Sequence, residues 1–267
     1  MSELKSRLVL AARKWLFAGR GEPYRIRGTT LRFVPGTRPV RLHYRTSENT
    51  VNRYDALQLG WMQGNLADGD LAIDIGANCG QCAIVMAQCC GASGRVIAFE
   101  PNPYAQDVLS RNFDLNPSVK RATIEAFACS DTAGGEVALY HNGNAANSAL
   151  VPLSGGSRTA AEPESFRVRV TTLDCYLAER RLPEPRFVKI DTEGAEIRVL
   201  QGAQKVLAGK ATILCELHPY AWPQFGNSLQ ELKVLAARYG RRIRYLDQAA
   251  EIGDNAVYGI VTLERAQ

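Results

Sequence analysis

The chain has 267 residues, of which 46% are hydrophobic and 22% are charged, a composition that excludes intrinsic disorder and favours one large domain with an appendage. No apolar run reaches the roughly 18 residues that a membrane-spanning helix needs. The first 17 residues mix charged with apolar side chains, unlike a secretory signal, so we expect a cytoplasmic protein.

Positive charge is concentrated at the N-terminus. Residues 1–50 contain eleven Lys or Arg and three Glu, whereas the whole chain carries a net charge of +5, so the remainder is mildly acidic. Such a basic segment is either a solvated charged face or a contact for an anionic partner. A phosphorylated or nucleotide-bearing substrate, a membrane surface and a nucleic acid are all compatible with the second interpretation.

The cysteines indicate a reducing environment. They are odd in number and lie within apolar helix and strand patterns: Cys79, Cys82, Cys89, Cys90, Cys129, Cys175 and Cys215. Cys79 and Cys82 have the spacing of half a zinc site, but no second pair accompanies them. We expect reduced, mostly buried thiols and no metal held by cysteine.

The N-terminal region is predicted to combine one helix with short strands. Apolar residues recur at helical spacing over 3–17, with basic residues off that stripe, which predicts an amphipathic helix. Extended runs near 24–27, 30–34 and 40–44 are separated by glycine and proline and predict small antiparallel strands. We expect the helix to pack on its own domain or to form a homo-oligomer contact, rather than to bind a membrane.

The main domain is predicted to be α/β. We divide the chain into a basic N-terminal appendage over residues 1–49 and a main domain over 50–267, which begins with a helix over 50–66. Apolar strands then alternate with amphipathic helices, which favours a mainly parallel sheet covered by helices on both faces. The predicted strands are 71–75, 95–99, 123–129, 186–190, 211–217, 242–246 and 257–263, and the predicted helices are 80–90, 103–116, 195–207 and 229–239. A short loop joins the last two strands, so one of them should run antiparallel.

An insertion over about 135–172 interrupts this alternation. Residues 136–141 and 167–171 are predicted as added strands. The polar segment 142–164 between them fits either a substrate lid beside the ligand edge of the sheet or a surface loop with no role.

The first core strand ends in a motif typical of a nucleoside-binding loop, Asp74-Ile-Gly-Ala-Asn-Cys-Gly80. Gly76 permits a tight turn and close approach of a ligand, and Gly80 permits close packing at the start of the next helix. The free N–H groups of that helix suit a carboxylate, and Asp74 suits an ammonium group, so an amino-acid moiety fits the loop. Asn78 stands where a pyrophosphate-binding loop requires little bulk, which disfavours a dinucleotide.

Acidic residues follow the next two strands. Glu100 ends the second strand and can accept hydrogen bonds from both ribose hydroxyls. Ser130 and Asp131 end the third strand, where they either flank an adenine ring or cap a turn. Together with the loop at Asp74, these residues favour a nucleoside cofactor without phosphates.

The fourth and fifth strands end in a second group of polar residues. Asp191, Glu193 and Glu196 follow the fourth strand, while Glu216 and His218 end the fifth. Carboxylates so close together at a strand end need solvent, a cation or a ligand. The fourth strand should neighbour the first, which places these groups beside the cofactor.

These motifs resemble the FkbM family of methyltransferases. The resemblance covers about residues 50–247 and rests on the loop at Asp74–Gly80, on Phe99-Glu-Pro-Asn102, on Lys189-Ile-Asp-Thr-Glu-Gly-Ala-Glu196 and on Glu216-Leu-His218. It implies a class I Rossmann-like methyltransferase fold with strand order 3-2-1-4-5-7-6. It also implies S-adenosylmethionine as cofactor, with Pro101 and Asn102 beside Glu100 in its site, and methyl transfer to a hydroxyl of a sugar or natural product.

For the chemistry, we expect the enzyme to align donor and acceptor and to remove the hydroxyl proton. His218 is the first candidate for the general base, because an ordinary imidazole is neutral near pH 7. Asp191, Glu193 and Glu216 are further candidates, and Asp191 also adjoins the cofactor. Mg²⁺ on these carboxylates is an alternative, but we expect no metal.

Two classes of acceptor remain open from the sequence. A small hydroxyl-bearing molecule is expected, without a stable nucleic-acid partner. The alternative is a macromolecule, RNA or protein, that binds the basic N-terminal segment. The sequence Asp191-Thr-Glu-Gly differs from the Asn/Asp-Pro-Pro-aromatic motif common in nucleobase amino-methylating enzymes, which argues against that reaction.

Overall fold

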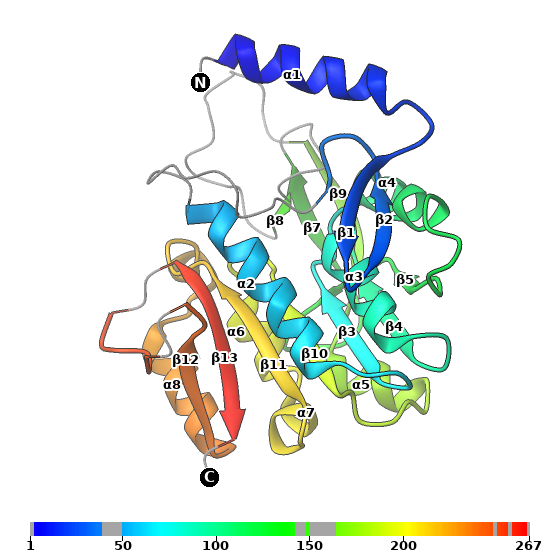
Figure 1. Cartoon of the computed structure of the whole chain (residues 1–267). Coiled ribbons are helices and arrows are strands. Elements are labelled where there is room, and N and C mark those ends of the chain that lie inside the picture. The colour runs from blue at the N-terminus through cyan, green and yellow to red at the C-terminus, as the bar shows by residue number, and fades with distance from the viewer. Residues whose placement is uncertain are drawn as a thin grey trace.

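The structure is a computed structural model that describes residues 3–38, 50–141, 148–149, 164–247, 250–255 and 258–265. A central sheet is covered by helices on both faces, and the N-terminal helix lies at one end of the molecule (Figure 1). Within the described residues, no helix has both the length and the apolar character needed to cross a bilayer. All seven cysteines are free and five are buried, as the sequence predicted.

The central sheet has seven strands in the order β12-β13-β11-β10-β3-β4-β5. Six strands point in the same direction, while β13 is antiparallel to both of its neighbours, β11 and β12. Numbered along the core, this is the order 3-2-1-4-5-7-6, so the class I Rossmann-like fold is confirmed. The strands are β3 (Leu71–Ile75), β4 (Arg95–Phe99), β5 (Thr123–Glu125), β10 (Phe187–Ile190), β11 (Thr212–Leu217), β12 (Arg241–Tyr245) and β13 (Gly259–Arg265).

The helices that cover the sheet largely match the prediction. They are α2 (Thr50–Asn65), α3 (Gln81–Cys90), α4 (Pro103–Asp114), α5 (Leu173–Glu179), α6 (Glu196–Gln201), α7 (Gln204–Ala208) and α8 (Leu229–Arg238), with a 3₁₀ turn η1 (Trp222–Phe225). The single helix predicted over 195–207 was wrong, because the chain breaks between α6 and α7. Gly202 lies there against the Ser130 carbonyl, and a Cβ atom would come within 2.0 Å of that oxygen.

The insertion forms a second sheet in the order β6-β9-β7-β8. Its strands are β6 (Phe127–Cys129), β7 (Glu136–His141), β8 (Ser148–Ala149) and β9 (Glu164–Thr171). The single third strand predicted over 123–129 is therefore divided, since β5 pairs with β4 and β6 pairs with β9. The predicted loop 142–164 lies mostly outside the described residues.

The N-terminal region consists of helix α1 (Glu3–Leu16) and a hairpin of β1 (Glu22–Ile26) and β2 (Thr29–Phe33). Hairpin residues Leu31 and Phe33 are buried in one hydrophobic cluster with Leu109 and Phe113 of α4. The hairpin thus shares a core with the main domain. The third strand predicted near 40–44 lies outside the described residues.

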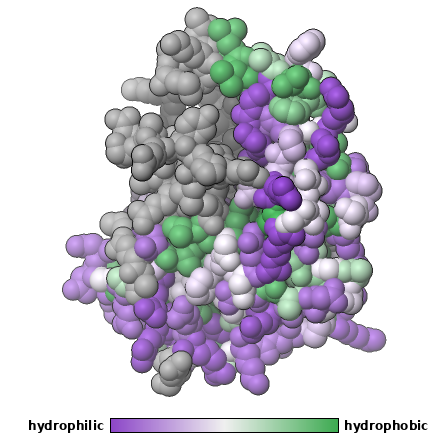
Figure 2. Space-filling model, in the orientation of Figure 1, coloured by the Kyte–Doolittle hydropathy of each residue, from purple (hydrophilic) through white to green (hydrophobic). Residues whose placement is uncertain are grey.

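Helix α1 is much less buried than the hairpin. Leu8, Val9, Trp15 and Leu16 are each more than half exposed, and Figure 2 shows hydrophobic side chains at the top of the molecule, where α1 lies. Arg13 of α1 reaches the buried Glu22 of β1 and forms an ion pair with it. The expected packing of this helix on a second subunit stays a prediction.

Candidate active site

The strand ends predicted to carry the chemistry lie side by side. β3 pairs with β10 and β10 with β11, all parallel, so their carboxyl ends share one edge of the sheet. Asp74 is opposite Lys189 in this register. The polar residues that follow each strand therefore meet at a single site.

The loop after β3 is held by two glycines in the left-handed region. Gly76 has φ 79°, and a Cβ atom there would lie 1.7 Å from the Asp191 carbonyl oxygen. Gly80 has φ 82°, and its Cβ would lie 2.0 Å from Leu109 of α4. Gly76 is thus required by contact between the β3 and β10 loops, a reason that differs from the ligand approach expected from the sequence. Asn78 also has a positive φ, 48°.

Glu100, directly after β4, braces this loop. Its two carboxylate oxygens accept hydrogen bonds from the backbone N–H of Asn78 at 2.7 Å and of Asn102 at 2.8 Å. Burial raises the pKa of Glu100 to about 7, although these hydrogen bonds oppose the shift. Asn102 in turn caps α4 by accepting from the Tyr104 N–H at 2.9 Å. Pro101 lies between these two residues and is half-buried.

A buried lysine, Lys189, links β3 and β10. Nζ of Lys189 lies 3.0 Å from Oδ2 of Asp191 and 3.8 Å from Oδ1 of Asp74. Burial opposes the charge on Lys189, but the carboxylates of Asp191 and Asp74 hold its pKa well above the usual value. Neither carboxylate oxygen of Asp74 has a hydrogen-bond partner among the described residues, and burial raises the pKa of this group. Asp74 therefore has unused capacity to accept hydrogen bonds.

His218 lies between two carboxylates at the end of β11. Its Nδ1 donates to Oε1 of Glu196 at 3.0 Å, and its Nε2 lies 3.6 Å from Oε2 of Glu193. Burial alone would lower the pKa of His218, but the hydrogen bond to Glu196 and the charges around the ring raise it to about 9. The imidazole is therefore mostly protonated at pH 7, unlike the neutral ring expected from the sequence.

Glu196 fixes the orientation of this imidazole. Its carboxylate is fully buried and also accepts from the Gly194 N–H at 2.7 Å and from Trp222 Nε1 at 2.8 Å. Three donors thus satisfy the buried charge and leave Nε2 as the ring nitrogen that faces Glu193.

Two tyrosines complete the cluster. Tyr220 donates to Oε2 of Glu193 at 3.3 Å, and Tyr258 donates to Oε1 of Glu216. Burial and the charge of Asp191 raise the pKa of Glu216 to about 7. Glu193 has φ 52°, a strained value for a residue with a side chain. The following Gly194 packs against Ala221, where a Cβ atom would approach within 2.5 Å.

Ser130 and Asp131 lie apart from this cluster in the topology. They follow β6 of the second sheet, and the Ser130 hydroxyl donates to Oδ1 of Asp131 at 2.9 Å. Ser130 is buried, whereas Asp131 is exposed. Their expected contact with adenine stays a prediction.

A divalent cation has one candidate position among the described residues. Asp191, Glu193 and His218 each offer a ligand atom, and these atoms lie within 4.8 Å of one another. Oxygen and imidazole ligands suit several divalent ions. The positive charge expected on His218 at pH 7 supplies an alternative way to neutralise the carboxylates.

Several residues of the site were assigned no role from the sequence. Lys189 had a signal, because a lone charged residue in a strand of buried residues needs a partner. Glu196 lies in the motif after β10, but only the structure shows that it orients His218. Trp222 and Tyr258 gave no signal, since tertiary packing brings them to the cluster.

Comparisons with known proteins identify the family of the chain. The sequence model described as "Methyltransferase FkbM domain" matches residues 74–243. The hexuronic acid methyltransferase AglP of Haloferax volcanii is 27% identical over 151 residues, which cover 57% of either chain. Methyltransferase sdnD of Sordaria araneosa is 31% identical over 166 residues, covering 53% of this chain and 63% of that protein. The chain thus spans about three fifths of the length of these curated relatives.

Among solved structures, a putative rRNA methylase from Clostridium thermocellum has a TM-score of 0.47 and 11% sequence identity. The match covers 79% of this chain and 93% of the other.

Proposed function

Because the chain belongs to the FkbM family of S-adenosylmethionine-dependent methyltransferases, we propose that it methylates a hydroxyl group of a sugar. The observation that carries the proposal is the cluster of Asp191, Glu193 and His218 directly beside the cofactor loop, where the Asp191 backbone packs on Gly76. Carboxylates and imidazole suit the binding and deprotonation of sugar hydroxyls. The similarity to a hexuronic acid methyltransferase supports a sugar acid as the first acceptor to test.

The residues of the cofactor loop fit the parts of S-adenosylmethionine. The buried Asp74 carboxylate lacks a hydrogen-bond partner among the described residues, so an ammonium group would satisfy it. The amino end of α3, which follows Gly80, has no side-chain cap, and the helix dipole there suits the methionine carboxylate. Glu100 retains lone pairs for ribose hydroxyls, with Pro101, Asn102 and Asn78 around it, and Ser130 and Asp131 are proposed for the adenine.

The cofactor supplies an activated sulfonium methyl group, so the protein has to position the acceptor hydroxyl and receive its proton. We assign that proton to Nε2 of His218, while Glu196 holds Nδ1. Glu216 is the second candidate, because its pKa of about 7 suits a general base. Asp191 and Glu193 would hold the sugar through hydrogen bonds.

The proposed reaction is tested by transfer of an isotope-labelled methyl group from S-adenosylmethionine. Glycosides of hexuronic acids, neutral sugars and an RNA transcript would be offered separately, and the product bond identified by NMR. We expect a methyl ether on the sugar. Methylation of the RNA alone would contradict the sugar proposal and support the macromolecular alternative.

The same assay tests the roles of the cluster. We expect His218→Ala and Asp191→Ala to lower turnover by at least about a hundredfold, the usual size of a general-base contribution. Near-normal turnover by both variants would contradict the assignment. We expect activity to survive a chelator, whereas loss of activity restored by Mg²⁺ would place a metal at Asp191, Glu193 and His218.

A further inference from the structure

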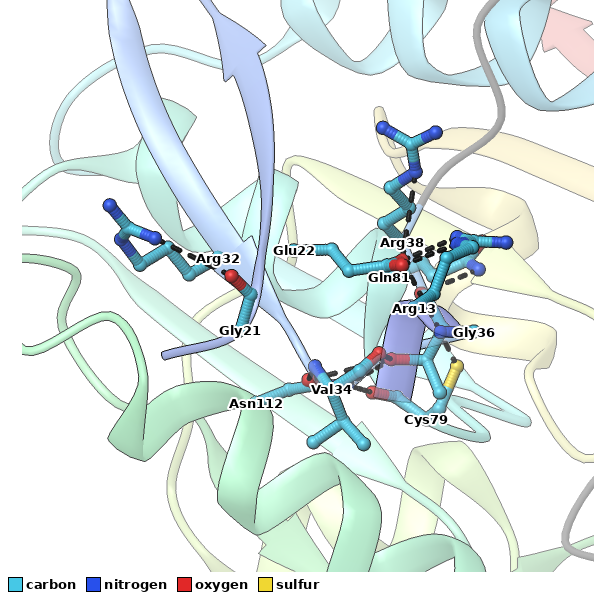
Figure 3. Close-up of polar contacts among 11 residues, drawn as sticks. Arg13, Gly21, Glu22, Arg32, Val34, Gly36, Arg38, Cys79, Gln81 and Asn112 are labelled. Carbon is cyan, nitrogen blue, oxygen red and sulfur yellow. Dashed lines mark hydrogen bonds and ion pairs between the residues drawn. The ribbon is translucent and has the colours of Figure 1, made fainter. Parts of the chain in front are cut away.

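The segment after β2, Val34–Arg38, lies close to the loop from Asp74 to Gly80, which we call the cofactor loop (Figure 3). Nε2 of Gln81, the first residue of α3, donates to the Thr37 carbonyl oxygen at 2.8 Å. The Cys79 thiol lies 4.0 Å from the same oxygen. A part of the N-terminal region thus contacts the loop that begins at Asp74, although about 40 residues separate them in sequence.

One buried side chain connects the two segments. Asn112 of α4 is fully buried. Its Oδ1 accepts from the Val34 N–H at 2.6 Å, and its Nδ2 donates to the Cys79 carbonyl at 2.7 Å and to the Thr37 hydroxyl at 3.0 Å. The amide oxygen thus binds the N-terminal segment, and the amide nitrogen binds both that segment and the cofactor loop.

Glu22 holds the same segment from its other side. Its buried carboxylate accepts from the Gly36 N–H at 3.3 Å and forms ion pairs with Arg13 and with Arg38, the latter at 3.6 Å. Figure 3 shows Arg13 and Arg38 converging on the Glu22 carboxylate, with Gln81 beside them. The segment from Val34 to Arg38 is thus fixed before it reaches the loop.

The cofactor loop needs such support because Asn78, a residue with a side chain, adopts a left-handed backbone conformation. Asn78 and Gly80 both have positive φ, and Cys79 lies between them. Conformations of this kind persist only where surrounding contacts determine them. The Cys79 carbonyl is one of these contacts, and Asn112 is its donor.

We propose that Asn112 is a positioning residue for the cofactor loop and that it couples the Val34–Arg38 segment to cofactor binding. It acts through the Cys79 backbone rather than by touching the ligand. By thermodynamic linkage, cofactor binding should stabilise the segment as much as the segment stabilises the cofactor-binding loop. The inference concerns the cofactor and is independent of the acceptor.

Asn116 provides a matched control. It lies one turn further along the chain from Asn112, accepts from the Arg32 N–H at 2.7 Å and donates to the Arg32 carbonyl at 2.6 Å. It is buried like Asn112, but it fastens strand β2 of the hairpin, directly before the segment that Asn112 holds. It also donates to the Asn112 backbone carbonyl at 2.7 Å, and none of these hydrogen bonds involves the loop from Asp74 to Gly80.

The test is the dissociation constant of S-adenosylhomocysteine, measured by calorimetry for the full chain and its variants. We expect Asn112→Ala to weaken binding about tenfold, while Asn116→Ala lowers thermal stability comparably but keeps binding within about twofold. Equal weakening by both variants, or unchanged binding by Asn112→Ala, would overturn the proposal.

A milder variant keeps the proposal testable if Asn112→Ala does not fold. Thr37→Val removes the hydroxyl that accepts from Asn112, and we expect it to weaken binding about threefold. Hydrogen exchange gives the reciprocal readout in the unmodified protein. S-adenosylhomocysteine should slow exchange of the Val34, Gly36 and Thr37 amides, and exchange that the ligand leaves unchanged would contradict the coupling.

Discussion

Lys189 shows how a single buried charge joins two strands. The side chain is almost fully buried and lies between the carboxylates of Asp74 and Asp191. Lys189 is the cation that β10 places near the buried Asp74 carboxylate, and its removal would leave that charge uncompensated from β10. A buried ion pair adds little net stability, but removal of one partner leaves a charge that cannot be solvated.

We therefore expect Lys189→Met to lower the free energy of unfolding by about 3 kcal/mol. Lys233→Met is the control, because Lys233 pairs with the fully exposed Asp254 and such surface pairs contribute about 0–1 kcal/mol. Denaturant unfolding of both variants makes the comparison. Equal stability of the two would show that Lys189 does not compensate the buried carboxylates.

Glu196 is the residue that sets the properties of His218. Its hydrogen bond and charge are the largest contributions that raise the pKa of the imidazole. We expect Glu196→Gln to lower the pKa of His218 from about 9 by more than Glu193→Gln does, since Glu193 lies 3.6 Å from the ring. NMR titration of the imidazole resonances measures both, and only three histidines need assignment. A larger fall in the pKa of His218 in Glu193→Gln would show that Glu193, and not Glu196, sets this pKa.

At the scale of elements, the contact between the β3 and β10 loops sets the shape of the site. Gly76→Ala would place a Cβ atom 1.7 Å from the Asp191 carbonyl and would strain a residue with φ 79°. We expect this variant to lose detectable binding of S-adenosylhomocysteine and to be destabilised by several kcal/mol, as overpacking and left-handed strain both act.

Gly60→Ala serves as the matched control for that substitution. Gly60 lies within α2, is exposed and has no atom within 4 Å of an added Cβ. The change should stabilise the protein by about 0.5–1 kcal/mol and leave cofactor binding unaltered. Binding by Gly76→Ala at the level of Gly60→Ala would contradict the close contact between the two loops.

Elements with strong local signals could be predicted from the sequence. The apolar strand β3 and its glycine turn were predicted from the residues, and the strand order was predicted from the family resemblance. The break at Gly202 and the departure of β6 from the central sheet depend on contacts distant in sequence. Periodicity alone therefore extended one helix and one strand too far.

At the scale of the whole molecule, the strand ends bring together residues from three segments of the chain. The sequence placed Asp191, Glu193, Glu216 and His218 at one sheet edge, and the structure confirms that β3, β10 and β11 are neighbours. The raised pKa of His218 could not be predicted, because it results from the surrounding Glu196, Asp191 and Glu193. The contact of the N-terminal segment with Cys79 could not be predicted either, because it depends on the packing of the hairpin against α4.

The pH dependence of methyl transfer tests the central claim that His218 receives the hydroxyl proton. The imidazole must be neutral to act, and its pKa is about 9, so turnover should rise with pH, reach half its maximum near pH 9 and level off above that pH. His218→Gln should lose this rise. A half-maximal rate already near pH 7, the pKa of Glu216, or a profile unchanged in His218→Gln, would contradict the account.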